Sequence, residues 1–349
     1  MQRLYLDEFH PVSQLRLDDH TPALPRFPII DMHGHMGPMM LGDNYEECYD
    51  TARQAELLRA CGLEKLVSME LVWGDRFLRL QNKLAAAGDF FLIFPSVDLS
   101  DVGSPSFEKE VFKTLRAYRG SGVKGIKLWK NITLTCRAPD GGVLRLDSPW
   151  LAPVFGYAGE LGLPIVIHVG DPPPFFQPNG PENEYYQCLC KHPEWSFCQP
   201  GIPGFEEHME MQERMLENNP GTIFVVAHVG SYAENLAQVS RWLEAYPNMY
   251  VDVAARIDQL GRQPYAAKNF MIRYQDRILF GSDYVPDIQD PAGFYGIHTR
   301  FFETLDEYFD HPFAGFLGNW KIYGMGLEED ILRKIYRDNT KRVFQIEGE

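Results

Sequence analysis

The stretch IFVVAH, residues Ile223 to His228, shows the pattern from which the fold can be predicted: an uninterrupted apolar run that ends in a polar residue. PIVIH, residues Pro164 to His168, repeats this pattern. Continuous apolar runs of this length are typical of parallel strands that are covered on both faces. Six further β-rich segments complete a predicted set of eight strands: Pro28 to His33, Lys65 to Glu70, Phe91 to Val97, Val123 to Trp129, Tyr250 to Ala254 and Ile278 to Ser282.

Helical patterns lie between these strands. Residues Tyr49 to Ala60, Phe107 to Tyr118 and Ala233 to Ala245 each place apolar side chains at spacings of three or four, which predicts amphipathic helices. Eight strand-then-helix units of this length close most naturally into a (β/α)8 TIM barrel. An open, doubly wound sheet is the alternative architecture.

Three segments fall outside the repeat. Residues 1–26 are predicted to form a proline-containing arm that packs across one barrel end or a neighbouring subunit, so a homodimer is an alternative to a monomer. Residues 27–349 are predicted to form a single barrel domain, closed by a helix from Glu328 to Phe344. Long loops at 131–147 and 170–205 follow the fourth and fifth strands, on the barrel face where active sites lie.

Composition narrows the classes of function. The chain of 349 residues carries 33 Lys and Arg against 48 Asp and Glu, a net charge of −15, which argues against nucleic acid and anionic membranes as partners. No apolar run approaches the ~20 residues of a membrane span, and the first residues contain no apolar signal segment. We therefore expect a cytoplasmic protein that acts on a small molecule.

Polar residues that can bind metal ions follow several of the predicted strands. Because parallel strands of a barrel end at one mouth, these side chains are expected to converge there. Residues two apart on a strand point to the same side, so the two imidazoles of His33 and His35 can bind one ion. A single histidine after an apolar run is more often a packed core residue, so the prediction depends on the combination. The candidates are His33, His35, His168, His228 and Asp283, an N/O donor set that suits zinc, with manganese, iron or cobalt as alternatives.

At these residues the sequence resembles a known family. The stretches IIDMHGH, PIVIHVGDPP, FVVAHVGS and RILFGSDYVPD are similar to the strand motifs of the amidohydrolase superfamily, specifically its amidohydrolase-2 branch. That branch includes aminocarboxymuconate semialdehyde decarboxylase, related aromatic-acid decarboxylases, hydrolases and lactonases. The resemblance implies that His33, His35, His168 and Asp283 hold one divalent ion, most simply Zn²⁺, with His228 as the catalytic acid or base.

The end of the fourth strand, GIKLWK, departs from the pattern of many decarboxylases in this branch. In other branches of the superfamily a lysine at this place is carboxylated and bridges two metals. By that resemblance Lys127 would be a bridge, and His168 and His228 would both bind a second ion. The mononuclear centre remains the leading prediction.

The metal centre predicts the chemistry. A bound zinc ion lowers the pKa of its water to about 7. Asp283 and His228 are expected to handle protons in either hydrolysis or decarboxylation. Asp31 is expected to orient a ligand imidazole or to act as a capping residue. Side chains predicted to contact the substrate are Trp129, Lys130, Asp171 and Arg256, the last as a clamp for a carboxylate unless it is solvated or paired with Asp258.

A cysteine-rich stretch in the second long loop is a weaker candidate. Cys188, Cys190, His192 and Cys198 do not have the spacing of a zinc ribbon, so buried thiols are a simpler interpretation than a structural metal.

Three functions follow, in order. Hydrolysis of a C–O or C–N bond in a small, carboxylate-bearing substrate leads slightly, because Lys127 is present and a second arginine at the mouth is not evident. Nonoxidative decarboxylation of a small aromatic or unsaturated acid is the alternative. A non-catalytic barrel with a structural ion is the third, disfavoured because structural zinc sites are closed and rich in cysteine.

Overall fold

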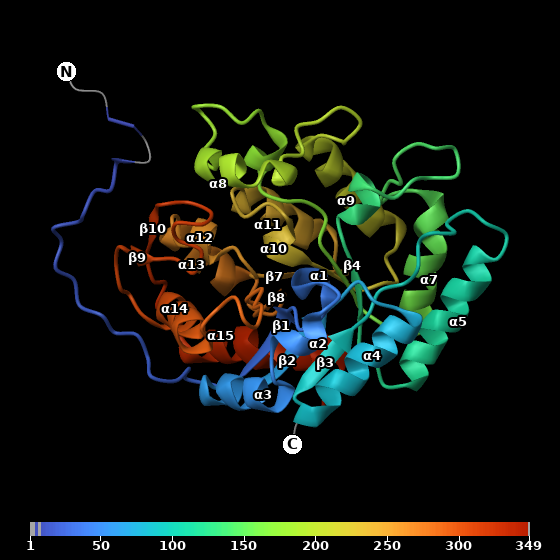
Figure 1. Ribbon diagram of the computed structural model, residues 1–349, viewed down its shortest axis with the longest axis horizontal. Helices are drawn as coiled ribbons and strands as arrows, with labels where there is room; N and C mark the ends of the chain where they lie inside the picture. The colour runs from blue at the N-terminus through green and yellow to red at the C-terminus, as the bar shows by residue number, and fades with distance from the viewer. Residues whose placement is uncertain (1–3, 6–7, 348–349) are drawn as a thin grey trace.

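The computed structural model describes residues 4–5 and 8–347 of the chain. Its parallel strands form two sheets, in the orders β1-β2-β3 and β4-β5-β6-β7-β8. Backbone hydrogen bonds join the sheets at both seams: Lys127 N donates to Pro95 O at 2.8 Å, and Asp283 N donates to His33 O at 2.7 Å. The strands thus close into the predicted barrel (Figure 1). Their bounds are β1 Ile29–Gly34, β2 Leu63–Met69, β3 Phe91–Phe94, β4 Ile126–Leu128, β5 Ile165–Ile167, β6 Phe224–Val226, β7 Met249–Asp252 and β8 Ile278–Leu279.

All eight predicted strands occur, but β3 to β8 are shorter than expected. The chain turns away at the mouth before the predicted ends. Pro95 follows β3 directly. His228 and Asp283 have φ values of 59° and 69°, which lie outside the β region, so the extended conformation stops at these residues. Two of the residues at which the backbone leaves the strand conformation, His228 and Asp283, therefore belong to the candidate site.

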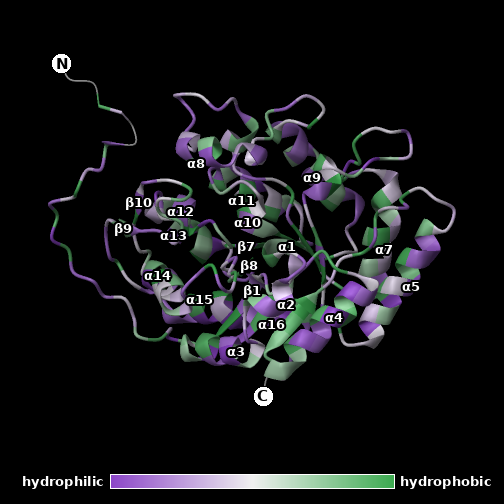
Figure 2. Cartoon of the chain, viewed as in Figure 1, coloured by the Kyte–Doolittle hydropathy of each residue, from purple (hydrophilic) through white to green (hydrophobic). Residues whose placement is uncertain are grey.

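Helices surround the barrel (Figure 1). Figure 2 shows hydrophobic strands inside and hydrophilic residues along the outer helices. Helix α3 begins at Thr51, two residues later than predicted, because the Asp50 side chain accepts a hydrogen bond from Arg53 N at 2.7 Å and caps it. Asn235 caps α11 in the same way. The larger helices are α3 Thr51–Ala60, α4 Gly74–Leu84, α5 Phe107–Gly120, α7 Ala152–Glu160, α9 Phe205–Asn218, α11 Leu236–Ala245, α13 Pro264–Arg273 and α14 Pro291–Glu303.

The bottom of the barrel is closed by the C-terminal segment. The predicted closing helix consists of α15 (Glu329–Arg333), a π-helical turn (Lys334–Asp338) and α16 (Asn339–Phe344). Within the π turn, Ile335 O accepts a hydrogen bond from Phe280 N at 2.9 Å, which ties the helix to the end of β8. Phe344 packs against Phe94 of β3 with ring centroids 4.7 Å apart. Only the opposite end of the barrel is therefore available for a site.

Short elements cover that open end. The loop from 170 to 205 has its own apolar cluster of Phe175, Tyr185, Cys188 and Leu189. The shorter elements of the chain are α1 Pro38–Leu41, α2 Tyr45–Cys48, α6 Asn131–Leu134, α8 Tyr186–Lys191, α10 Ala227–Gly230, α12 Ile257–Leu260 and the antiparallel pair β9 Phe309–Asp310 and β10 Lys321–Ile322. No helix among the described residues has both the length and the apolar character that crossing a membrane would require.

Candidate metal centre

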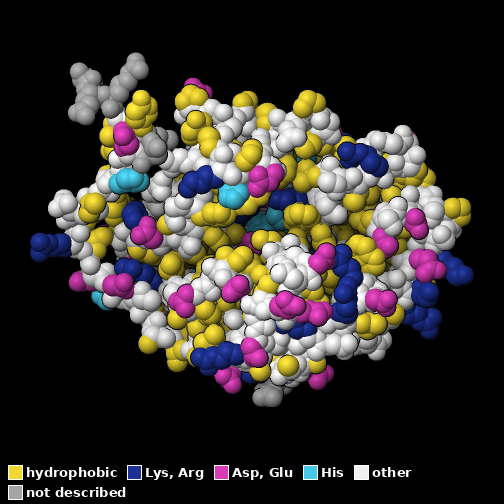
Figure 3. Space-filling view, in the orientation of Figure 1, with side chains coloured by type: hydrophobic (Ala, Val, Ile, Leu, Met, Phe, Trp, Pro, Cys, Tyr) yellow, Lys and Arg dark blue, Asp and Glu magenta, His cyan; other side chains and the backbone are white. Residues whose placement is uncertain are grey.

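The candidate site lies at the mouth of the barrel, where the strands end. Figure 3 shows a depression near the middle of this face, with histidine side chains visible at its floor. His33, His35 and His228 are buried, and the side chain of Asp283 is 28% exposed. The site is therefore mostly dry but open to the mouth through Asp283.

Three of the predicted ligands converge. His35 Nε2 lies 3.0 Å from Asp283 Oδ1, and His33 Nε2 lies 3.7 Å from the same oxygen. One ligand atom from each of these residues lies within 4.8 Å of the other two. The spacing of two residues in HxH thus brings both imidazoles to one carboxylate, as the strand geometry predicts.

Hydrogen bonds at the far side of each ring fix the tautomers. His35 Nδ1 donates to Met69 O at 2.8 Å, and His33 Nδ1 donates to Asp252 Oδ2 at 2.8 Å. In the neutral imidazoles, each Nε2 then presents a lone pair toward the oxygen of Asp283. Lone pairs that face one another in a buried site repel unless a cation lies among them. The donor set therefore fits a divalent metal ion.

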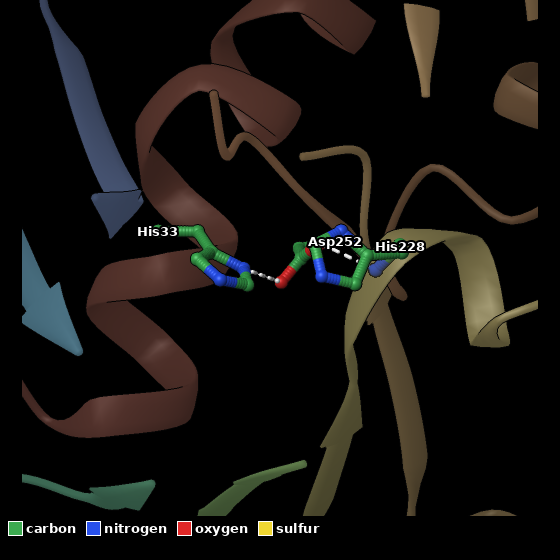
Figure 4. A group of neighbouring side chains, drawn as sticks. All are labelled: His33, His228 and Asp252. Atoms are coloured by element: carbon green, nitrogen blue, oxygen red, sulfur yellow. Dashed lines mark hydrogen bonds and ion pairs between the residues drawn. The ribbon is translucent and has the colours of Figure 1, made fainter. Parts of the chain in front are cut away.

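Asp252, at the end of β7, organises the centre from below. One carboxylate oxygen accepts from His33 Nδ1, and the other accepts from His228 N at 2.8 Å, so that Asp252 lies between the two histidines (Figure 4). Burial opposes its ionisation, but the neighbouring His33 holds the pKa of Asp252 below its ordinary value. A charged carboxylate at this place keeps both residues oriented.

Lys127, at the end of β4, reaches the same centre. Its side chain is fully buried, and Nζ lies 3.3 Å from His33 Nε2 and 3.7 Å from Met69 Sδ. Burial lowers the pKa of Lys127 to about 8. Burial, together with the charge of Lys127, lowers the pKa of His33.

His168 and His228 form a second pair beside this cluster. His228 Nδ1 donates to Ala254 O at 2.8 Å, so its Nε2 accepts from His168 Nδ1 at 3.1 Å. His168 Nε2 is then left with a lone pair and has no hydrogen-bond partner among the described residues. The structure places His168 against His228 rather than within the group of His33, His35 and Asp283.

Charges in this pair are also set by burial. Desolvation lowers the pKa of His168 to about 3 and that of His228 well below its ordinary value. Burial opposes the ionisation of Asp283, but the neighbouring His35 and His33 hold its pKa well below the usual range. Burial thus favours the neutral form of His168 and His228, and the neighbouring histidines favour the ionised form of Asp283, which are the forms that bind a metal ion.

The backbone around the site is strained. His228, Val229 and Asp283 all have left-handed φ values, between 57° and 69°. Gly281 permits the close approach of the segment after β8 to β1, because a Cβ atom there would lie 2.9 Å from the Cβ of His33.

The predicted substrate contacts divide into two groups. Lys130 forms an ion pair with Asp171 and lies over the ring of Trp129, 5.4 Å from its centroid, so these three residues form one wall. Arg256 is buried and donates from Nη1 to Ala255 O at 2.7 Å. Among the described residues it forms no ion pair with Asp258, and its burial excludes the solvated alternative.

Two buried carboxylates were missed from the sequence, and Asp31, expected either to orient a ligand imidazole or to act as a capping residue, binds backbone N–H groups and forms no hydrogen bond with an imidazole among the described residues. Asp252 and Glu70 follow β-rich runs, in YVDVA and VSME, so the signal used for the other strands could have found them. Asp31 contacts the backbone N of His33 and Ser282 and the hydroxyl of Tyr295, whereas Asp252 contacts the ring of His33.

The cysteine-rich loop does not form a metal group among the described residues. Cys188 is buried in the apolar cluster of the loop, where burial raises the pKa of its thiol to about 11, while Cys190 and Cys198 are exposed. The expectation of buried thiols therefore holds for Cys188 and is wrong for Cys190 and Cys198.

Solved structures share this fold. The chain is similar to 2,6-dihydroxybenzoate decarboxylase from Rhizobium, at 16% identity and a TM-score of 0.57 over 92% of this chain and 100% of that one. It is similar to 5-carboxyvanillate decarboxylase from Sphingomonas paucimobilis, at 14% identity and a TM-score of 0.55 over 92% and 100%. A dihydroxybenzoic acid decarboxylase from Polaromonas sp. JS666, with bound manganese and the inhibitor 2-nitroresorcinol, matches at 15% identity and a TM-score of 0.56 over 92% and 97%.

Sequence comparison identifies the family. Among curated proteins no sequence matches the chain significantly. The amidohydrolase family model, in contrast, matches residues 30–346. This range contains all eight strands of the barrel apart from Ile29, the first residue of β1. The chain therefore belongs to the amidohydrolase family, and it is a metal-dependent enzyme of the hydrolase or carboxy-lyase type.

Proposed function

We propose that the protein is a nonoxidative decarboxylase of a small aromatic or unsaturated acid. The observation that carries this proposal is the placement of positive groups at the mouth: the amino group of Lys127 beside His33, and the buried guanidinium of Arg256 next to the strand that bears Asp252. A carboxylate substrate needs such groups to replace its hydration. The three similar structures named above are decarboxylases, which supports the same choice over hydrolysis.

We propose that His33, His35 and Asp283 hold one divalent ion, with His168 as a further ligand candidate. Zinc suits these nitrogen and oxygen donors, with manganese, iron and cobalt as alternatives. When bound, the ion supplies a Lewis acid that polarises the oxygen atoms of the substrate. The other steps belong to residues of the chain.

Arg256 and the wall of Trp129, Lys130 and Asp171 orient the acid. As the bond between the ring carbon and the carboxylate breaks, CO2 leaves and the electron pair stays on the carbon, which must then be protonated. His228 is the proposed proton carrier: its Nδ1 is held by Ala254 O, so a proton enters or leaves at Nε2, the atom that accepts from His168 Nδ1. Asp283 is the second group of this proton-handling pair.

Hydrolysis of a C–O or C–N bond is the second candidate, and one observation favours it. Lys127 of β4 lies beside His33, and His168 contacts His228 at 3.1 Å. A carboxylated Lys127 would therefore lie between the pair His33 and His35 and the pair His168 and His228. Such a centre would hold two ions and activate water for attack on a carbonyl. The location that we propose for either enzyme is cytoplasmic.

The test measures CO2 and hydrolysis products from the same preparation. Metal-loaded protein is incubated with carboxyl-labelled hydroxybenzoates and, in parallel, with esters and lactones of similar size. We expect labelled CO2 from the wild type and loss of turnover in His228→Asn. Arg256→Ala should raise KM. Arg342→Ala, at an exposed position, is the control and should leave KM unchanged. Turnover of esters or lactones without release of CO2 from any acid would favour hydrolysis instead.

A further inference from the structure

The arm that precedes the barrel exposes a row of apolar side chains. In the described stretch, residues 4–5 and 8–17, none is buried or half-buried. Val12 is 80% exposed and Leu15 is 61% exposed. The hydrogen bonds described for this stretch join residues only two or three apart. The exposed apolar side chains are Leu4, Tyr5, Phe9, Val12, Leu15 and Leu17.

The root of the arm, in contrast, is firmly attached to the barrel. His20 N and Nδ1 contact the two carboxylate oxygens of Asp306 at 2.8 and 2.6 Å, and Arg300 Nη1 donates to Asp19 Oδ2 at 3.1 Å. Arg26 donates to Glu329 at 2.7 Å. Residues before 18 therefore leave from a fixed point, and Figure 1 shows the arm running along the outside of the molecule, beyond β9, β10 and α14.

We propose that the arm, through its described residues 4–5 and 8–17, docks on a second copy of this chain, in a reciprocal exchange of arms. An exchanged arm requires a fixed root and a free, apolar end. Here the polar contacts of the root set the direction of the arm, and the apolar side chains beyond it remain available to bind the surface of another molecule. A surface segment of a monomer without such a partner would be expected to carry polar side chains instead.

Apolar surface for the partner's arm lies around the root itself. Leu305, which neighbours the anchoring residue Asp306, is 75% exposed, and Leu24 and Tyr308 are also exposed. In a two-fold arrangement each arm passes the root of the other, because a two-fold interface uses the same patch on both copies. The arms and the apolar roots would then cover one another.

The areas involved suit a stable dimer. If each of the six side chains buries roughly 100 Å² of apolar surface, two arms remove roughly 1,200 Å² from water, and the surfaces that they cover add a similar area. The total of roughly 2,400 Å² lies within the ~2,000–5,000 Å² that permanent homodimer interfaces bury. A stretch of 14 residues reaches about 45 Å when extended, which is longer than the ~20 Å radius of gyration expected for a domain of this size.

The first test is the mass of the full-length protein by sedimentation equilibrium. We expect twice the chain mass of 40.1 kDa for the wild type. The double variant Phe9→Asp with Leu15→Asp should raise the dissociation constant at least about 100-fold with unchanged circular dichroism, because charged side chains would replace two apolar contacts in each arm. Leu78→Asp, an equally exposed position on α4, is the control and should leave the dissociation constant unchanged.

A cross-link identifies the surface on which the arm docks. Phe9→p-benzoylphenylalanine is irradiated, and the products are separated under denaturing conditions. Docking on a second copy gives a product of twice the chain mass. A product of single-chain mass, linked between residue 9 and the barrel of its own chain, would overturn the proposal. A wild type that remains at the mass of one chain at tens of micromolar protein, or a dimer that tolerates both aspartates, would overturn it as well.

Discussion

Asp252 offers a sharp test of how the metal centre is organised. In Asp252→Asn one oxygen can still accept from the backbone N of His228, but the amide NH2 group then faces His33 Nδ1, where a carboxylate oxygen accepts at 2.8 Å in the wild type. Two donors facing one another favour the tautomer of His33 in which Nε2 carries the hydrogen. That tautomer offers no lone pair to a metal.

The magnitude follows from the loss of one such partner. Removing a hydrogen-bond partner of a ligand histidine typically weakens metal binding 10- to 100-fold, which corresponds to about 1.4–2.7 kcal/mol. The assay is competition between the protein and a chromophoric chelator, for the wild type, Asp252→Asn and the control Asp276→Asn. Asp276 is exposed and pairs with Lys334, so its change should leave metal affinity unaltered. Equal affinity in Asp252→Asn and the wild type would refute the proposed role of Asp252.

Three further predictions concern stability and the role of the ion. Asp258 is buried without a hydrogen-bond partner for its carboxylate among the described residues, and desolvation raises its pKa to about 7. Because the folded state binds this proton more tightly than the unfolded state, the carboxyl reduces stability progressively as pH rises from about 4 to 7. Asp258→Asn should therefore gain stability relative to the wild type over that range, reaching about 2–4 kcal/mol above pH 7, and a difference in urea unfolding that does not depend on pH would contradict this. Phe344→Ala should cost about 3–5 kcal/mol in the same assay, because the ring fills the barrel floor against Phe94, and a loss below 1 kcal/mol would show that the floor is not packed as described. Chelation of the ion should abolish turnover and leave the circular dichroism spectrum intact, whereas unfolding on chelation would indicate a structural ion.

The strand ends could be predicted from the sequence because they combine two independent signals. A continuous apolar run predicts a buried parallel strand, and a polar residue directly after it predicts a place at the mouth. The same reasoning brought His33, His35 and Asp283 to one place. It could not predict that His168 contacts His228, because this contact depends on the left-handed backbone at His228 and on ring orientations that spacing does not determine.

Contacts across the barrel were beyond the reach of the sequence. Asp31 stands next to HxH in the chain, yet Asp252, more than two hundred residues away, contacts the ring of His33. Residues two apart on a regular strand point to the same side, but the register of β1 shifts between Asp31 and Gly34, so the spacing in the sequence does not give the direction of the Asp31 side chain. The π turn in the closing helix also went unpredicted, because the pattern of Ile331, Leu332 and Ile335 fits an unbroken helix.

We propose that His33, His35 and Asp283 hold the catalytic ion, so the metal content of the protein should depend on them. Inductively coupled plasma mass spectrometry on protein purified without added metal would be applied to the wild type, His33→Ala and the control Cys190→Ala, whose exposed thiol lies outside the site. We expect one divalent ion per chain in the wild type and in Cys190→Ala, and none in His33→Ala. An ion that persists in His33→Ala, or a wild type that holds none even after incubation with zinc or manganese, would contradict the account.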